Sequence, residues 1–167
     1  AQGLSEMLSL SFTSAQLNRL FAGTQATSPI PLVNPLSAEG AEMRVSLLGN
    51  LMRVLQHNLR QGESGVTMFE LGKVFLGGQE IPDGRQERLH VAGVLYGNWP
   101  ASGLQKSTAI EFADLKGVLE ALLQDLRCEE KIRWERATNV PFLHPGKAAA
   151  ILIDGTVCGV AGAVHPD

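Results

Sequence analysis

The sequence predicts an α+β fold in which helices flank an antiparallel sheet. Two long segments repeat apolar residues at steps of three and four, which places those residues on one face of a helix. Several shorter apolar segments are bounded by glycine, proline or aspartate, as strands commonly are. One boundary is Asp154-Gly155, a pair that favours a two-residue hairpin between antiparallel strands.

Two long helices and one short helix are predicted. The long helices span residues 42–59 and 112–126, and Asp114 in the first turn of the second one suits the helix dipole. A Ser14 cap begins the short helix, which runs to Phe21. The apolar stripes of the long helices are Met43, Leu47, Leu48, Leu51, Met52, Leu55 and Leu59, and Phe112, Leu115, Val118, Leu119, Leu122, Leu123 and Leu126.

Most of the remaining apolar segments are predicted to be strands. Residues 88–97 are expected to form a buried strand, and Gly72 within residues 66–75 indicates a bulge or a close backbone approach. Residues 23–35 contain Pro29 and Pro31 and are therefore predicted to form a loop. The predicted strands are residues 6–12, 66–75, 88–97, 131–137, 148–153 and 156–164.

Composition limits the class of protein. With 167 residues, of which 44% are hydrophobic and 19% charged, residues 1–167 are expected to form one globular domain. The net charge of −3 argues against a nucleic-acid surface over the whole molecule. No run approaches the roughly 20 apolar residues of a membrane span, so no membrane contact and a cytoplasmic location are expected. Cys128 and Cys158 lack metal-ligand spacing, which indicates unpaired thiols.

One local basic patch surrounds Trp134. Its cations are Lys131, Arg133 and Arg136, which could contact RNA together with the aromatic ring. The same composition is typical of an edge strand, where charged side chains prevent aggregation. The edge-strand interpretation is favoured, and an RNA contact stays open.

Five motifs occur in the order found in one known family. Together they resemble the beta chain of bacterial phenylalanyl-tRNA synthetase over nearly the whole of this chain. The motifs are Asn34-Pro35-Leu36-Ser37, Met43-Arg44-Val45-Ser46-Leu47-Leu48 with a helix ending near Asn58, Phe69-Glu70-Leu71-Gly72, Phe112-Ala113-Asp114-Leu115-Lys116-Gly117, and the paired signatures Leu143-His144-Pro145-Gly146 and Gly159 to His165-Pro166.

This resemblance implies that residues 1–167 are a fragment of a longer beta chain. The fragment would be a catalytic-like, inactive copy of the class II synthetase core, packed against the alpha chain in a tetramer of two alpha and two beta chains. In the family this holoenzyme attaches phenylalanine to its tRNA and uses ATP and magnesium. The resemblance implies no cofactor, catalytic residue or metal ligand in the fragment itself.

Arg44 and Glu70 each allow two interpretations, a substrate-binding role and a structural role. An ATP-activating class II site needs an arginine on the strand at 66–75, where Lys73 is the only cation and lacks the bidentate fork of arginine. Glu70 could bind a substrate amino group, and Arg44 could hold a substrate carboxylate as in active relatives. Structural roles are favoured: Glu70 paired with a cation or with backbone amides, and Arg44 in a fold-stabilising or subunit-facing ion pair.

The other motif residues are interpreted as structural or interface positions. Asn34 before Pro35 indicates a turn, and the four histidines are too scattered for a metal motif. Two alternatives to the scaffold interpretation stay open: a free-standing class II-like amino-acid ligase that uses Arg44 and Glu70, and a tRNA-binding module that uses the basic patch. The structural or interface candidates are Asn34, Pro35, Arg44, Asn58, Phe69, Glu70, Gly72, Asp114, Lys116, Gly117, His144, Pro145, His165 and Pro166.

Overall fold

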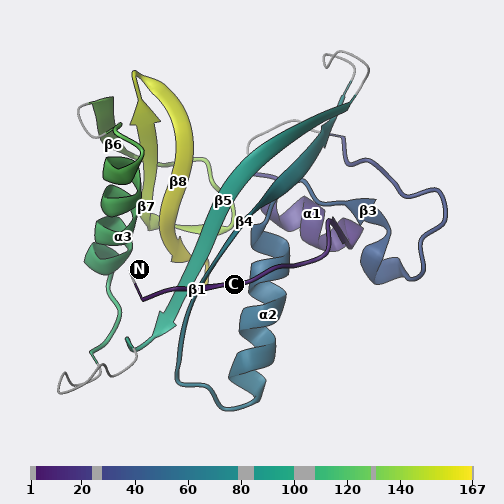
Figure 1. Cartoon of the computed structure of the whole chain (residues 1–167), viewed down its shortest axis with the longest axis horizontal. Helices are drawn as coiled ribbons and strands as arrows, with labels where there is room; N and C mark the ends of the chain where they lie inside the picture. Colours follow the sequence, from purple (N-terminus) through teal and green to yellow (C-terminus); the bar gives the residue numbers. More distant parts are fainter. Residues whose placement is uncertain (1–2, 24–27, 79–84, 100–107, 129–130, 167) are drawn as a thin grey trace. The chain divides into compact units, whose positions relative to one another are not determined.

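The chain folds into two compact units, Ala1–Ala109 and Ile110–Asp167 (Figure 1). Both units combine helices with strands, and most strand pairs are antiparallel, which confirms the α+β class. The expectation of one domain over residues 1–167 stays a prediction. A computed structural model describes residues 3–23, 28–78, 85–99, 108–128 and 131–166.

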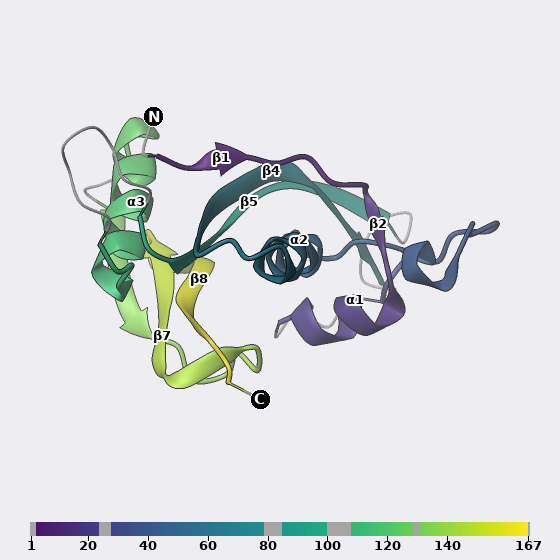
Figure 2. The same cartoon turned by 90° about the horizontal axis from the view of Figure 1, so that it is seen from below.

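The first unit is a curved three-stranded sheet that covers one long helix (Figure 2). The sheet has the order β1-β4-β5, in which β1 is parallel to β4 and β4 is antiparallel to β5. A two-stranded antiparallel sheet, β2-β3, lies in the same unit. Its elements are β1 Ser5–Glu6, β2 Phe12–Thr13, α1 Ala15–Phe21, the 3-10 helix η1 Ala38–Gly40, β3 Glu42–Met43, α2 Leu48–Arg60, β4 Gly65–Gly77 and β5 Arg85–Gly97.

The core of the first unit forms where α2 packs on β4. Side chains alternate along a strand, so every second residue of β4 faces the helix. Leu51 and Leu55 of α2 are buried there, and Leu51 is fully inaccessible to solvent. The remaining buried members of this core are Val45, Leu47, Met68, Val74 and Leu76.

The predicted helix at 42–59 is wrong in its first six residues, because α2 begins only at Leu48. Glu42 and Met43 pair with β2 instead, and the Met43 amide donates to the Ile30 carbonyl at 2.8 Å. The Ser46 hydroxyl accepts a hydrogen bond from the Leu48 amide at 3.2 Å, which marks the new start. Tertiary pairing therefore overrides an apolar repeat that extends back to Met43.

Two strand predictions in this unit also need correction. Residues 6–12 are not one strand, because only the ends of that segment pair: β1 with β4 and β2 with β3. Residues 88–97 do form most of β5, but the strand is not buried. Within the described residues β5 is an edge strand, and Leu89 and Val91 are 67% and 49% exposed.

The second unit packs one helix on a three-stranded antiparallel sheet of order β6-β7-β8. Leu123 of the helix packs with Ile151 and Ala161 of the sheet. Trp134 lines the same core, and in the described part of the chain its strand is an edge, as predicted. The elements are α3 Phe112–Asp125, β6 Ile132–Arg136, β7 Leu143–Ile153 and β8 Thr156–Val164.

The hairpin predicted at Asp154-Gly155 is confirmed. The two residues have φ of 51° and 79°, the left-handed values that a two-residue turn of this kind requires. β7 begins at Leu143 rather than at residue 148, and its register shifts between Leu143 and Ala148, where Pro145 interrupts regular pairing.

Gly155→Ala and Gly117→Ala are expected to change stability in opposite directions. A Cβ at either position meets no atom within 4 Å, so only backbone conformation distinguishes the two glycines. Alanine at 155 is strained by its positive φ and should cost about 1–2 kcal/mol. Alanine at 117, inside α3, should add about 0.5–1 kcal/mol. Thermal unfolding followed by circular dichroism measures both, and shifts of the same sign would contradict the expectation.

Candidate functional site

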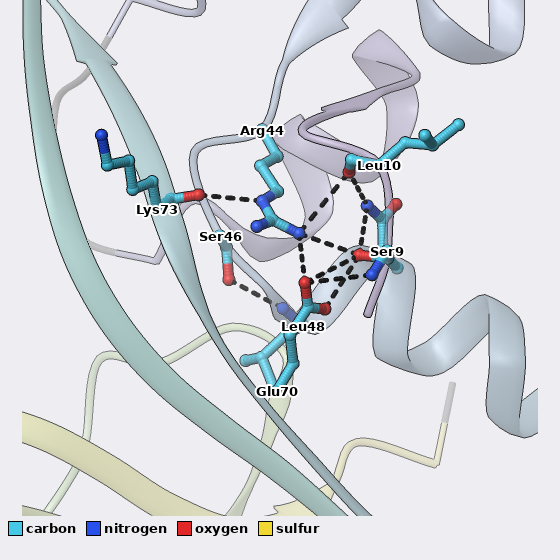
Figure 3. Close-up of polar contacts among 8 residues, drawn as sticks. Ser9, Leu10, Arg44, Ser46, Leu48, Glu70 and Lys73 are labelled. Carbon is cyan, nitrogen blue, oxygen red and sulfur yellow. Dashed lines mark hydrogen bonds and ion pairs between the residues drawn. The ribbon is translucent and has the colours of Figure 1, made fainter. Parts of the chain in front are cut away.

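Arg44 and Glu70 meet in a buried ion pair (Figure 3). Arg44 lies between β3 and α2, and Glu70 lies at the middle of β4 on the face toward α2. Arg44 Nη1 is 2.6 Å from Glu70 Oε1, and the two side chains are only 4% and 2% exposed. Of the roles considered for these residues, the structure shows the pairing within the fold, because each charge is neutralised by the other.

The arginine also ties three backbone segments together. Its Nε donates to the Lys73 carbonyl at 2.9 Å, and its Nη1 also donates to the Ser9 hydroxyl at 2.8 Å. Its backbone amide donates to the Ser11 carbonyl, and its carbonyl accepts from the Phe75 amide at 2.9 Å. Arg44 therefore connects the segment before β2 to the inner face of β4.

Ser9 and Asn50 complete the site, and neither is evident from the sequence. The Ser9 hydroxyl donates to Glu70 Oε2 at 2.8 Å, and the Ser9 amide donates to Oε1 at 3.2 Å. Asn50 Nδ2 donates to the Ser9 hydroxyl at 3.1 Å and to the Leu10 carbonyl at 2.9 Å. The sequence marks Asn50 only as an asparagine beside the apolar stripe in the first turn of α2, and it does not mark Ser9 at all.

The ion pair and its hydrogen bonds compensate the two buried charges. Buried ions are costly unless hydrogen bonds accompany the pairing, and here the carboxylate accepts from both a guanidinium and Ser9. Arg44 uses Nε and Nη1 within the fold, and both oxygens of Glu70 accept hydrogen bonds there. The chemistry that the site supports is structural.

Gly72 provides the space that the guanidinium needs. A Cβ on Gly72 would lie 2.5 Å from Arg44 Nη2, so the close approach expected at this glycine is confirmed. The alternative of a bulge is not found, because the β4-β5 register runs unbroken through Gly72 and its partner His90.

Burial, followed by the charge of Arg88, lowers the pKa of His90 below its ordinary value.

Other predicted residues of the first unit lie outside this network. Asn34 and Pro35 are exposed in the loop before η1. Asn58 lies in the last turns of α2, where its Nδ2 donates to the Val54 carbonyl at 2.8 Å. Phe69 lies on β4 opposite Gly93 of β5.

The predicted residues of the second unit make local contacts. Asp114 Oδ2 accepts from the Glu111 amide at 2.7 Å at the start of α3. Lys116 Nζ lies 5.7 Å from the centre of the Trp134 ring, within reach of a cation–π contact. Gly117 lies within α3, where an added Cβ would meet no atom within 4 Å.

The two His-Pro pairs lie at the same end of β7 and β8, because Leu143 pairs with Val164. His144 Nδ1 accepts from the Gly146 amide at 3.0 Å, and the His165 amide donates to the Phe142 carbonyl at 3.0 Å. Pro145 and Pro166 follow these histidines directly. The contacts stabilise the local backbone at this end of the sheet.

The residues of the basic patch, 131–136, make contacts within their own unit. Trp134 packs into the core of its unit, and Lys131 is paired with Asp154 at 3.0 Å. Arg136 Nη2 donates to the Pro145 carbonyl at 3.4 Å. The patch therefore has the character of a protected edge strand.

The residues of β4 do not match the phosphate-binding strand that an ATP-activating class II site needs. β4 carries no arginine for a phosphate, and Lys73 is paired with Glu87 at 2.7 Å. Among the described residues, no three His, Cys, Asp or Glu side chains are grouped as a metal site would require. A further finding for the same part of the chain is that its helices are too short or too polar to cross a membrane.

Comparison with known proteins identifies related chains. A family described as "Phenylalanyl tRNA synthetase beta chain CLM domain" matches residues 1–167. The phenylalanine–tRNA ligase beta subunits of Halalkalibacterium halodurans, Ralstonia nicotianae and Vibrio cholerae are 34%, 35% and 35% identical to this chain over 99% of its length. The chain spans about a fifth of the length of these curated relatives, 21%, 20% and 21% respectively.

Proposed function

Because the chain belongs to the phenylalanyl-tRNA synthetase beta chain CLM domain family, we propose that it is a non-catalytic module of a phenylalanine–tRNA ligase beta chain. The module is an inactive class II-like core that packs against the alpha chain. The assembly is a cytoplasmic tetramer of two alpha and two beta chains, and it charges tRNA(Phe) with phenylalanine using ATP and magnesium at sites outside this module.

The buried Arg44–Glu70 pair is the observation that carries the non-catalytic role. These are the two residues that a class II-like ligase would use for its substrate, and here each forms an ion pair with the other. Releasing either one would leave an unpaired charge in the core, at a cost of about 3–5 kcal/mol. Substrate binding would have to supply that free energy before any chemistry began.

Pyrophosphate exchange tests this role. The full-length beta chain alone should not exchange pyrophosphate into ATP in the presence of phenylalanine, whereas the complex with the alpha chain should. Exchange by the beta chain alone that Lys73→Ala abolishes would favour the free-standing ligase instead.

The packing role is supported by a loop that exposes two large apolar side chains. Val33 and Leu36 are 93% and 101% exposed, on either side of Asn34-Pro35. Neither side chain contributes to the buried core of the first unit. Exposed apolar residues grouped in one loop are typical of a contact with another protein.

Val33→Asp together with Leu36→Asp, placed in the full-length beta chain, is expected to weaken association with the alpha chain at least about tenfold, or 1.4 kcal/mol. The melting temperature should stay unchanged, since both side chains are exposed. Leu126→Asp together with Val157→Asp, at residues of the second unit that are 62% and 60% exposed, is the matched control. Analytical ultracentrifugation measures the association, and equal losses for the loop variant and the control would contradict the assignment of this loop.

A further inference from the structure

The turn between β7 and β8 places a carboxylate next to an uncovered backbone amide. Asp154 and Gly155 form this turn, and the Asp154 side chain is 63% exposed. A Cβ added to Gly155 would meet no atom within 4 Å, so no neighbouring group shields that side of the turn. The Gly155 amide donates to no backbone carbonyl of the described residues. Both groups therefore lie at an open part of the surface.

An Asp-Gly pair can rearrange without an enzyme, because glycine has no side chain that hinders attack by its own amide on the preceding carboxyl group. The Gly155 nitrogen bonds to Cγ of Asp154, and one carboxyl oxygen leaves as water with the amide proton and the carboxyl proton. Water then opens the succinimide at the former main-chain carbonyl, which yields isoaspartate and routes the chain through Cγ. One water is released and one is consumed, and nothing is oxidised or reduced.

Lys131 holds the aspartate of this turn at two points. Its Nζ lies 3.0 Å from Asp154 Oδ2, and its carbonyl accepts a hydrogen bond from the Asp154 amide at 3.2 Å. Attack by the Gly155 nitrogen requires the carboxyl group to leave Lys131 and to rotate toward the backbone. The ion pair therefore opposes the first step of the rearrangement.

The fold requires the same two residues that react. Their φ values of 51° and 79° lie in the left-handed region, which aspartate and glycine adopt more readily than most residues. Replacing either residue to avoid the reaction would therefore strain the turn. Isoaspartate adds one backbone atom to a two-residue turn, and the pairing of Ile153 with Thr156 depends on the length of that turn. Rearrangement would thus loosen this end of the hairpin.

We propose that Asp154-Gly155 is a site of spontaneous isoaspartate formation and that the Lys131 ion pair slows it. The reaction needs only residues of the second unit and water, so it does not depend on the proposed function. The sequence contains one other Asp-Gly pair, Asp83-Gly84, which lies outside the described residues and provides an internal reference.

Ageing of the full-length beta chain tests the site and the role of Lys131. The natural protein, Lys131→Gln and Lys147→Gln are incubated in water enriched in oxygen-18, which labels each hydrolysed succinimide. Peptide mass spectrometry with electron-transfer fragmentation then locates and quantifies isoaspartate. Isoaspartate at position 154 is expected to form about two- to fivefold faster in Lys131→Gln than in the natural protein, the factor that one exposed ion pair supplies.

A matched control and the internal reference show whether Lys131 acts locally. Lys147→Gln removes the same charge from an exposed residue of β7 and should leave the rate at Asp154 unchanged. The rate at Asp83 should be the same in all three proteins. Absence of isoaspartate at Asp154 from all three would overturn the site. Equal rates at Asp154 in all three, or an equal acceleration at Asp83 and Asp154 in Lys131→Gln, would overturn the role of Lys131.

Discussion

Arg44→Met is expected to lower the free energy of unfolding by about 3–5 kcal/mol, because it leaves the Glu70 carboxylate buried without its countercharge. The Lys73 carbonyl and the Ser9 hydroxyl lose a donor at the same time. Urea unfolding of the purified chain, followed by far-UV circular dichroism, measures the loss.

The double variant Arg44→Met with Glu70→Met should be more stable than Arg44→Met alone. Replacing both members of a buried pair by apolar residues removes the unpaired charge and often restores stability. Arg53→Met is the matched control, because Arg53 pairs with Glu39 at the surface, where both side chains are at least half exposed. That control should cost no more than about 1 kcal/mol. A double variant whose cost equals the sum of its single variants would show that the pair does not act as a unit.

Gly72→Ala is expected to cost about 1–3 kcal/mol through overpacking. The new Cβ would lie 2.5 Å from Arg44 Nη2 and 3.3 Å from both Glu70 Oε1 and Leu47 Cδ2. The guanidinium cannot simply move away, because the Lys73 carbonyl holds its Nε at 2.9 Å. The same urea titration measures this variant.

The Arg44→Met background identifies the cause of that cost. Methionine lacks the Nη2 atom, so the additional loss from Gly72→Ala should be smaller there than in the natural sequence. Gly159→Ala is the control for a strand glycine, because its Cβ would make only an ordinary contact of 3.6 Å with Ile151. An equal cost of Gly72→Ala in both backgrounds would assign the strain to Leu47 or to the backbone rather than to the guanidinium.

Several elements could be predicted because their causes are local. The Asp154-Gly155 hairpin needs only two residues that accept positive φ. The α3 helix follows from its own apolar repeat, and Ser14 caps α1 by accepting the Leu17 amide at 3.2 Å. Membership of the family likewise depends on the order of short motifs, which can be read along the chain.

The candidate site was predicted in its charged residues but not in its connections. Arg44 and Glu70 are both identifiable from the sequence, yet no local pattern shows that residues 26 positions apart form one pair. Ser9, 61 positions from Glu70, was missed, because a serine between two leucines in an apparent strand has no distinguishing signal. Its role exists only once β1 and β4 lie side by side.

The sequence by itself determined the α+β class, the later turns of α2, α3, the hairpin and the family. Only the tertiary structure decided that Glu42–Met43 is a strand, that β5 lies at an edge, and that Arg44 is buried against Glu70. The physical reason is the range of the interactions. Turn preference and helical periodicity act over a few residues, whereas strand pairing and the burial of a charge depend on segments that meet only after the chain has folded.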